Sequence, residues 1–277
     1  MIRLSAFADE ISPDLDEQVA VLQREGIRYL DLRGVWNINV LDLSDEQIGK
    51  IKRTLDAQGI GVAAIGSPLG KVALDSPLEI QKLERAIQVA KVFETLYIRI
   101  FSFYPPERST EGDVEADRYR DEVTGRLQVM IERASAAGVT LLHENEKDIY
   151  GDSIAHCVDL MQSCEDEHFR VAFDPANFIQ CGQVPYPDAY EALLPWLAYV
   201  HVKDALPDGS VVAAGEGVSH WPELLRHLRE DGYDGFLSLE PHLAAAGQFK
   251  GFSGPEQFAR ASQALQGMLK AMGWEYS

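Results

Sequence analysis

Short apolar segments alternate with amphipathic stretches along the entire chain, and this alternation restricts the fold more than any other feature. The apolar segments have the length of strands, and the stretches between them have the length of helices. Strands that alternate with helices form parallel sheets, and eight such units can close into a barrel. The sequence therefore predicts an α/β fold, a single (β/α)8 barrel, with strands at Ile2–Phe7, Ile27–Leu32, Gly61–Ile65, Tyr97–Phe101, Thr140–Glu144, Arg170–Phe173, Tyr199–Val202 and Phe236–Leu239.

The stretches between these strands carry helix start and stop signals. Ser44 and Gln47 have the spacing of a capping box, and Gly59 follows where a left-handed residue commonly ends a helix. Gly138 ends a longer stretch in the same way. We expect helices at Pro13–Glu25, Ser44–Gln58, Leu78–Phe93, Val114–Ala137, Ser153–Ser163, Pro187–Leu194, Trp221–Asp231 and Pro255–Met272.

Nothing in the sequence divides the chain into parts. No Pro/Gly/Ser-rich linker or low-complexity block interrupts the 277 residues, and 46% of them are hydrophobic, which is enough for one large core. We therefore expect a single domain over residues 1–277. A doubly wound open sheet is the competing architecture. It normally has fewer strands, and no Gly-x-Gly-x-x-Gly follows the first strand to suggest a dinucleotide site.

The composition argues against several classes of partner. The net charge of −19 opposes nucleic-acid binding, because that binding depends on cations that neutralise phosphates. The N-terminus lacks the pattern of a signal peptide, and no segment approaches the roughly 20 apolar residues that span a bilayer. Three cysteines without disulfide or metal spacing suit a reducing compartment. We expect a cytoplasmic protein that binds neither nucleic acid nor membrane; the sequence leaves homo-oligomerisation open.

Four of the expected strands end on residue types that bind divalent metals. These residues are Glu144, Asp174, His201 and Glu240, separated by 30, 27 and 39 residues, or about one βα unit each. A parallel barrel collects the carboxyl ends of its strands at one face, where side chains from several strands meet. Three carboxylates with one imidazole suit manganese, magnesium, zinc or cobalt better than a closed thiolate site would. The sequence therefore predicts a site for one divalent metal.

The phase of the strands supports the same prediction. Side chains alternate along a strand, so one parity faces the helices and the other faces the barrel lumen. In Tyr199–Lys203 the aliphatic Val200 and Val202 face the helices, which directs His201 and Lys203 inward. The same test directs Asp31, Arg33 and Arg99 inward. Buried charges need partners, and a metal and a polyhydroxylated substrate would provide them.

Several inward residues have two interpretations each. Lys203 could pair with Asp204 or Glu240, or could donate to a substrate oxygen. Arg33 and Arg99 could pair with carboxylates or hold substrate oxygens. Asn177 and Glu146 lie near the expected ligands. We interpret Asn177 as a contact to a ligand or to substrate rather than a simple turn residue, and Glu146 as an anchor for a ligand or substrate.

Two further segments are less informative. The run from Gly66 to Lys71 lacks the spacing of a phosphate-binding loop, and we interpret it as a loop that faces the substrate. His220 and His242 follow strands on the expected active face, where each is more simply a surface histidine.

The four strand ends resemble the sugar phosphate isomerase/epimerase superfamily, the xylose isomerase-like TIM barrels. Its members carry a Glu, an Asp, a His and a Glu as metal ligands after strands 5, 6, 7 and 8. The resemblance covers essentially the whole chain. The matching segments are His143-Glu144-Asn145-Glu146, Phe173-Asp174-Pro175-Ala176-Asn177, Val200-His201-Val202-Lys203-Asp204 and Leu239-Glu240-Pro241-His242.

Two departures from the superfamily narrow the prediction. Ketose epimerases and endonuclease IV carry a His three residues after the Asp, where this chain has Asn177. Endonuclease IV also needs histidines after strands 2 and 3, and this chain has no His before His143. These differences and the acidic charge argue against a nuclease.

The resemblance implies a divalent-metal-dependent isomerase or epimerase of a sugar, sugar phosphate or cyclitol. The reaction would pass through an enediolate, with Glu144 and Glu240 as the opposed acid and base. Lys203, Asn177, Arg99, Arg33 and Glu146 would contact the substrate. Two alternatives stay open: a metal-dependent lyase of the inosose dehydratase type, and a non-catalytic sugar-binding barrel.

Overall fold

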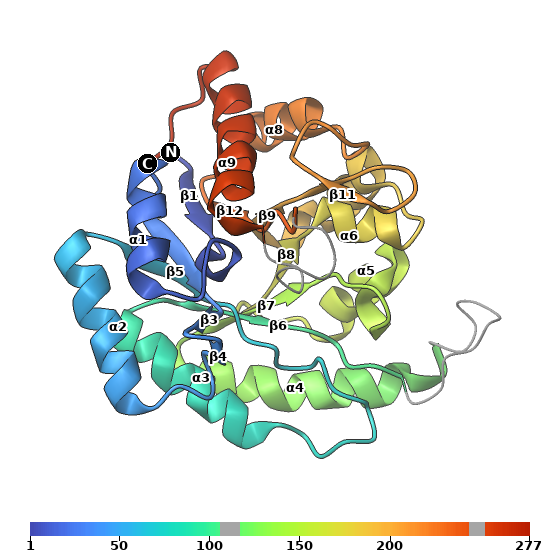
Figure 1. The fold of residues 1–277 in the computed structure, drawn as a ribbon. Helices are drawn as coiled ribbons and strands as arrows, with labels where there is room; N and C mark the ends of the chain where they lie inside the picture. The colour runs from blue at the N-terminus through green and yellow to red at the C-terminus, as the bar shows by residue number, and fades with distance from the viewer. Residues whose placement is uncertain (106–116, 244–252) are drawn as a thin grey trace.

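The computed structural model describes residues 1–105, 117–243 and 253–277. Eight parallel strands form one sheet in the order β1-β12-β9-β8-β7-β6-β5-β2, and an isolated parallel bridge between Phe7 and Asp31 joins the two outer strands. The predicted (β/α)8 barrel is confirmed (Figure 1). Its strands are β1 (Arg3–Ala6), β2 (Tyr29–Leu32), β5 (Gly61–Ile65), β6 (Tyr97–Ile100), β7 (Thr140–Glu144), β8 (Phe169–Phe173), β9 (Leu197–Val202) and β12 (Phe236–Leu239).

Helices surround the barrel on its outside (Figure 1). The capping box at Ser44 forms as expected, because the Ser44 hydroxyl accepts from Gln47 N–H and the Gln47 side chain accepts from Ser44 N–H. Gly59 and Gly138 end their helices in the left-handed conformation, which glycine adopts without strain. The longer helices are α1 (Leu15–Arg24), α2 (Asp45–Gln58), α3 (Ile80–Phe93), α4 (Arg120–Ala137), α5 (Ile154–Ser163), α8 (Trp221–Glu230) and α9 (Gly254–Ala271).

Two predicted helices differ from the structure. Helix α4 begins at Arg120, after a 3-10 turn, η2 (Asp117–Tyr119), and residues 114–116 of the prediction lie outside the described residues. The helix expected at Pro187–Leu194 is divided into a π-helical turn, η4 (Pro185–Ala189), the short α7 (Tyr190–Leu193) and a 3-10 turn, η5 (Leu194–Trp196). Prolines in η4 and η5 explain this division, because a proline has no N–H to continue a helical ladder.

Several short elements at the carboxyl ends of the strands were not predicted. Helix α6 (Pro175–Gln180) begins directly after β8, with Asp174 as its N-cap. The strands β3 (Gly34–Val35) and β4 (Ile38–Asn39) form one small hairpin, and β10 (Asp204–Ala205) and β11 (Val211–Val212) form another. Two 3-10 turns, η1 (Ala8–Glu10) and η3 (Tyr150–Asp152), complete this end of the barrel.

A polar layer inside the barrel lies beside the strand that carries His201. Buried Asp31 accepts hydrogen bonds from the hydroxyls of Ser5 at 2.7 Å, of Tyr199 at 2.6 Å and of Ser238. The register explains the cluster, because Ser238 pairs with both Ser5 and His201 on the two neighbouring strands. Burial raises the pKa of Asp31, although the three hydroxyls oppose that effect.

The remaining fold predictions concern cysteines and membranes. Cys157 and Cys164 are buried, Cys181 is half-buried, and all three are free thiols. Among the residues that the structure describes, no helix is both long and apolar enough to cross a membrane.

Candidate metal centre

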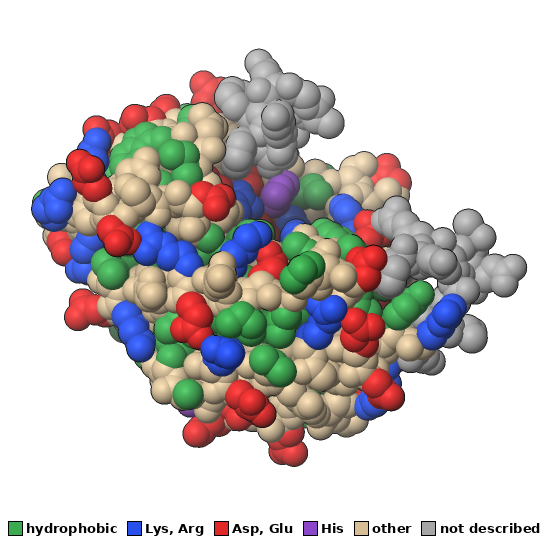
Figure 2. All heavy atoms as spheres, turned by 90° about the horizontal axis from the view of Figure 1, so that it is seen from below, with side chains coloured by type: hydrophobic (Ala, Val, Ile, Leu, Met, Phe, Trp, Pro, Cys, Tyr) green, Lys and Arg blue, Asp and Glu red, His purple; other side chains and the backbone are tan. Residues whose placement is uncertain are grey.

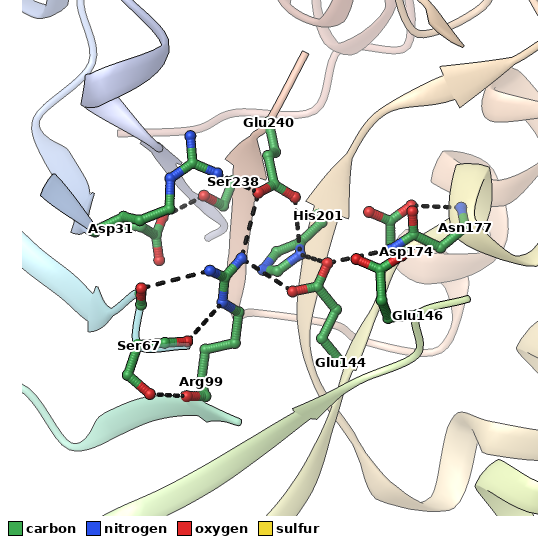
Figure 3. Close-up of polar contacts among 12 residues, drawn as sticks. Asp31, Ser67, Arg99, Glu144, Glu146, Asp174, Asn177, His201, Ser238 and Glu240 are labelled. Carbon is green, nitrogen blue, oxygen red and sulfur yellow. Dashed lines mark hydrogen bonds and ion pairs between the residues drawn. The ribbon is translucent and has the colours of Figure 1, made fainter. Parts of the chain in front are cut away.

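Four side chains meet at the carboxyl ends of the strands. Glu144 is the last residue of β7, His201 lies in β9, and Asp174 and Glu240 directly follow β8 and β12. Each offers one ligand atom, and these four atoms all lie within 4.8 Å of one another. All four residues are buried, and Figure 3 shows their side chains pointing toward one another. The barrel thus brings together the four predicted metal ligands.

The cluster contains buried atoms that lack hydrogen-bond partners. In the described parts of the chain, five buried side-chain nitrogen or oxygen atoms have none, and three belong to this cluster: Asp174 Oδ2, His201 Nδ1 and Glu240 Oε2. Lys203 Nζ lies 2.7 Å from Asp174 Oδ2 without forming a hydrogen bond, and the charged neighbours of Glu240 Oε2 are 3.6 and 3.7 Å away. Leaving such atoms unsatisfied is costly, so their convergence suits a bound cation.

The charged residues around the cluster, which we call the floor of the site, point to a divalent ion. With the imidazoles neutral and the carboxylates ionised, five carboxylates face three permanent cations, which leaves two excess negative charges. One divalent ion would neutralise them. The carboxylates are Asp9, Glu10, Glu144, Asp174 and Glu240, and the cations are Arg33, Arg99 and Lys203.

Two arginines hold the glutamates of the cluster. Arg99 Nη1 lies 3.0 Å from Glu144 Oε2 and 3.3 Å from Glu240 Oε1, so one guanidinium bridges both carboxylates (Figure 3). Arg33 Nη1 lies 2.7 Å from Glu240 Oε1. Both guanidiniums pack on the ring of Phe7, at 4.8 Å for Arg33 and 4.7 Å for Arg99. The structure thus pairs both arginines with carboxylates, which was one of their two predicted roles.

The cationic surroundings keep both glutamates ionised. Burial alone would raise the pKa of Glu144, but His201 and Arg99 outweigh it and lower that pKa to about 2. Burial also opposes ionisation of Glu240, yet Lys203, His242 and Arg99 hold its pKa well below its usual range. Both side chains are therefore carboxylates at neutral pH, the form in which they bind metals.

The other two members of the cluster have pKa values shifted upward. Burial raises the pKa of Asp174, and Lys203 only partly opposes this. Burial favours neutral His201, but Glu144, whose Oε1 lies 3.2 Å from His201 Nδ1, outweighs it and raises the imidazole's pKa. Protons therefore compete with a metal for His201 more strongly than they would for a free histidine.

Of the two carboxylates expected to pair with Lys203, the structure shows Glu240. The Lys203 ammonium lies 2.7 Å from Asp174 Oδ2 and 3.6 Å from Glu240 Oε2, not against Asp204. The Asp204 carboxylate instead accepts hydrogen bonds from four backbone N–H groups between Ala205 and Ser219. Asp204 begins the β10–β11 hairpin, and its carboxylate is held by the backbone of that loop.

Two asparagines hold the loops that carry ligands. The Asn145 side chain donates to Asp174 O and accepts from Asp174 N–H, both at 2.9 Å. Asn177 donates from its side chain to Glu144 Oε1 at 3.2 Å and to Asn145 O at 2.9 Å. Asn177 therefore contacts a predicted ligand, whereas the part played by Asn145 was missed.

Glu146 lies apart from the cluster, at the edge of the cavity. Its Oε2 pairs with Lys71 at 2.8 Å, and its Oε1 accepts from the backbone N–H of Lys147 at 3.0 Å. In the described parts of the chain, the Glu146 side chain forms no hydrogen bond or ion pair with the four clustered residues. Its inward parity predicted its direction but not its partner, because Lys71 comes from the loop after β5.

Three residues near the cluster were not recognised from the sequence. Asp9 and Glu10, in η1, pair with Arg33 at 2.7 and 2.8 Å. His242, expected at the surface, is about one-third exposed, and its Nε2 lies 3.3 Å from Glu240 Oε1 and 3.5 Å from Glu10 Oε1. The adjacent acids after the first strand were the available signal.

A cavity of about 350 Å³ opens above the cluster, a size typical of small-ligand sites. The loop from Gly66 to Lys71 contributes to its wall, as expected. On the face that Figure 2 shows, Lys and Arg side chains and a His side chain border a hollow in the surface. The lining includes Arg33, Asn39, Gly66, Pro68, Lys71, Arg99, Glu144, Glu146, Lys147, Asn177, Gln180, Lys203, Val211, Glu240 and His242.

Comparison with known proteins decides the family. A family model described as a xylose isomerase-like TIM barrel matches residues 19–270, most of the chain. The chain belongs to the xylose isomerase-like TIM-barrel family. The resemblance seen in the sequence is therefore confirmed. No curated protein matches the chain by sequence.

Several solved structures share the fold over nearly the whole chain. The probable 3-DHS dehydratase from Bacillus anthracis is 18% identical, with a TM-score of 0.75, and the match covers 96% of this chain and 99% of that one. A D-tagatose 3-epimerase-like protein is 17% identical, with a TM-score of 0.75 and 98% of both chains covered. The IolI protein with a bound zinc atom is 15% identical, with a TM-score of 0.74, covering 98% and 99%. At these identities the likeness shows the fold alone.

Proposed function

We propose that this protein is a divalent-metal-dependent isomerase or epimerase of a small polyhydroxylated carbonyl compound. One observation carries the proposal: Glu144 and Glu240 reach the same point from β7 and β12, which are separated in the sheet by β8 and β9. Two carboxylates that approach one site from different sides can remove a proton on one face and return one on the other. The similar solved structures include a D-tagatose 3-epimerase-like protein and a probable 3-DHS dehydratase, which supports the proposal.

Glu144, Asp174, His201 and Glu240 would hold the ion. Their three carboxylates and single imidazole suit Mn, Mg, Zn or Co, and one solved relative has a zinc atom bound. When bound, the ion would supply Lewis-acid stabilisation of negative charge that develops on substrate oxygens. The unpartnered atoms and the two excess negative charges of the floor support this assignment.

The chain's own residues would divide the remaining work. One glutamate takes the proton from the carbon beside the carbonyl, which produces an enediolate, and the other returns a proton. Return to the opposite face of the same carbon gives epimerisation, and return to the adjacent carbon gives aldose–ketose isomerisation. Arg99 and Lys203 keep the two glutamates ionised and lie in the cavity wall, where each would stabilise a substrate oxygen.

Two alternatives use the same site. In a lyase of the dehydratase type, the enediolate would lose a β-hydroxyl group, and the dehydratase among the relatives makes this the second candidate. In a non-catalytic sugar-binding barrel, no proton would move. Four retained ligand types argue against the binding barrel, because binding alone does not need two opposed carboxylates.

Solvent deuterium exchange separates these functions. The metal-loaded protein would be incubated in D2O with a panel of ketoses, inososes and hydroxypyruvate, and products would be followed by NMR and mass spectrometry. We expect metal-dependent deuterium incorporation beside the carbonyl of at least one compound, with an epimer or isomer as product. A dehydrated product would establish the lyase. Tight binding of a panel member without any exchange would establish the binding barrel.

A further inference from the structure

Two lysines line the cavity away from the metal cluster. Lys71 follows β5 and Lys147 follows β7, and both belong to the cavity lining together with Asn39 and Gln180. The exposed fraction of the Lys71 side chain is 32%, and Lys147 is exposed, so both side chains are accessible from solvent. We call Lys71, Glu146 and Lys147 the cationic rim.

The contacts of the rim hold both lysines in place. Lys71 Nζ pairs with Glu146 Oε2 at 2.8 Å and lies 4.2 Å from the centre of the Phe101 ring. Lys147 Nζ donates to Gln180 Oε1 at 3.2 Å, while Gln180 Nε2 donates to Gly209 O at 3.0 Å. An ammonium group has three N–H donors. Each lysine thus keeps donors for a further acceptor.

The charge of the rim differs from that of the floor. The floor carries two excess negative charges, which one divalent ion would neutralise. The rim has two ammonium groups against one carboxylate and therefore keeps one excess positive charge after the floor is balanced. In a chain of net charge −19, an accessible cavity wall with excess positive charge favours an anionic group.

We propose that the cationic rim binds an anionic terminus of the substrate, a carboxylate or a phosphate monoester, through Lys71 and Lys147. This inference rests on the proposed function, because it assumes that the carbonyl end of the same molecule lies at Glu144 and Glu240. The substrate is then an acidic sugar derivative rather than a neutral sugar. Charge-assisted hydrogen bonds from two ammonium groups would provide the selectivity.

Binding of inert polyols tests the rim without turnover. Ribitol, ribonate and ribitol 5-phosphate have no carbonyl group to react and differ in their terminal charge. Their dissociation constants for the manganese-loaded protein would be measured by calorimetry at low and high salt. We expect at least one anion to bind about tenfold more tightly than ribitol, with a preference that weakens at high salt. Preference for ribonate or for the phosphate identifies the terminus.

Single substitutions assign the preference to the two lysines. Lys71→Gln and Lys147→Gln should each weaken the anion about threefold to tenfold while leaving ribitol binding unchanged. Lys91→Gln, on the exposed surface of α3, is the matched control and should change neither. Equal affinity for ribitol and both anions, no binding of either anion, or an anion preference unaffected by both rim substitutions would overturn the inference.

Deuterium exchange distinguishes failure of the rim from failure of the proposed function. If neutral ketoses exchange as fast as their acidic counterparts, the anionic terminus is wrong and the isomerase stands. If no carbonyl compound exchanges but lysine-dependent anion binding persists, the isomerase is wrong and the rim stands.

Discussion

At the scale of single residues, the two glutamates have unequal surroundings. Glu240 Oε1 lies within 3.3 Å of Arg33, Arg99 and His242, whereas Glu144 has Arg99 at 3.0 Å and His201 at 3.2 Å. More positive charge around a carboxylate makes it a weaker base. Glu144 is therefore the better acceptor for the substrate's proton, and Glu240 is better suited to return one.

Glutamine at either position tests this division of roles. An amide oxygen can contact a metal but cannot exchange a proton, so each variant should retain metal at saturating concentration and lose about 10²–10⁴-fold in turnover. Glu240→Gln should still exchange the substrate's C–H proton with solvent, whereas Glu144→Gln should not. Turnover and deuterium incorporation would be measured at the same metal occupancy. Near-wild-type turnover by both variants would end the two-carboxylate mechanism.

His143 predicts a pH dependence of stability that is separate from catalysis. Its ring is buried against Gly151, with Nε2 3.0 Å from Ser102 Oγ, and burial lowers its pKa to about 4. The unfolded chain binds this proton near pH 6.5 and the folded chain only near pH 4. Between these values the unfolded state holds more protons, so stability falls as pH falls, by about 3 kcal/mol over the window.

Urea unfolding of the metal-free protein between pH 4.5 and 7.5 measures this effect. His143→Gln, which cannot take up a proton, should show a shallower loss of unfolding free energy across the window. His168→Gln serves as the control. His168 is half-buried and directly precedes β8, the strand that pairs with the strand of His143. Equal pH slopes for wild type and His143→Gln would contradict the assignment.

At the scale of elements, long amphipathic segments were predictable and short ones were not. All eight barrel strands were expected, because each is an apolar segment bounded by helix signals. Helix α6 has six residues, too few for a periodic pattern, although Asp174 followed by Pro175 is a typical helix start. The hairpins of β3–β4 and β10–β11 have strands of two residues each, which carry no period.

The same limit applies to the site. Strand parity and spacing predicted the convergence of the four ligand-type residues, because strand ends are fixed by the barrel. Parity and spacing could not predict that Asp9 and Glu10 pair with Arg33, because the segments after the strands have no periodic conformation. They also did not predict the contact between His242 and Glu240, which forms where His242 has a left-handed backbone conformation.

Asp204 provides a test at the scale of one loop. Its buried carboxylate accepts four backbone N–H groups and so organises residues 205–219, whose Val211 lines the cavity. Asp204→Ala would leave these donors unsatisfied and should destabilise the protein by about 3 kcal/mol. Hydrogen exchange should increase in residues 205–219. Asp208→Ala, which removes one exposed acceptor in the same loop, should have little effect on either measurement.

At the scale of the whole molecule, ion pairs link the site to the point where the barrel closes. An isolated bridge joins β1 to β2, and Arg33, after β2, reaches η1 through Asp9 and Glu10 and the end of β12 through Glu240. The N- and C-terminal ends also pair, through Ile2 and Tyr276 (Figure 1). An ion would join the ends of β7, β8, β9 and β12, and Arg33 links one of its ligands, Glu240, to the residues at the closure.

Metal binding should accordingly raise the stability of the entire barrel. A ligand that binds only the folded state stabilises it by about 2.7 kcal/mol at 100 times its dissociation constant. We expect the thermal midpoint to rise with added Mn²⁺ and to fall with a chelator, and the Glu144→Ala/Glu240→Ala double variant to lose this response. Ion content by mass spectrometry should be about one per chain in the wild type.

Acid should reverse the same stabilisation, because the ligands must be deprotonated. The raised pKa of His201 means that protons displace the ion as pH falls, and loss of metal and of activity should occur together below about pH 5–6. Protonation of His143 should also destabilise the metal-free protein in this pH range. Loss of activity must therefore be compared with metal content measured directly, not with protein stability. Full metal retention at pH 5 with lost activity would show that another group titrates. Metal retention by the double alanine variant would instead place the ion elsewhere in the molecule.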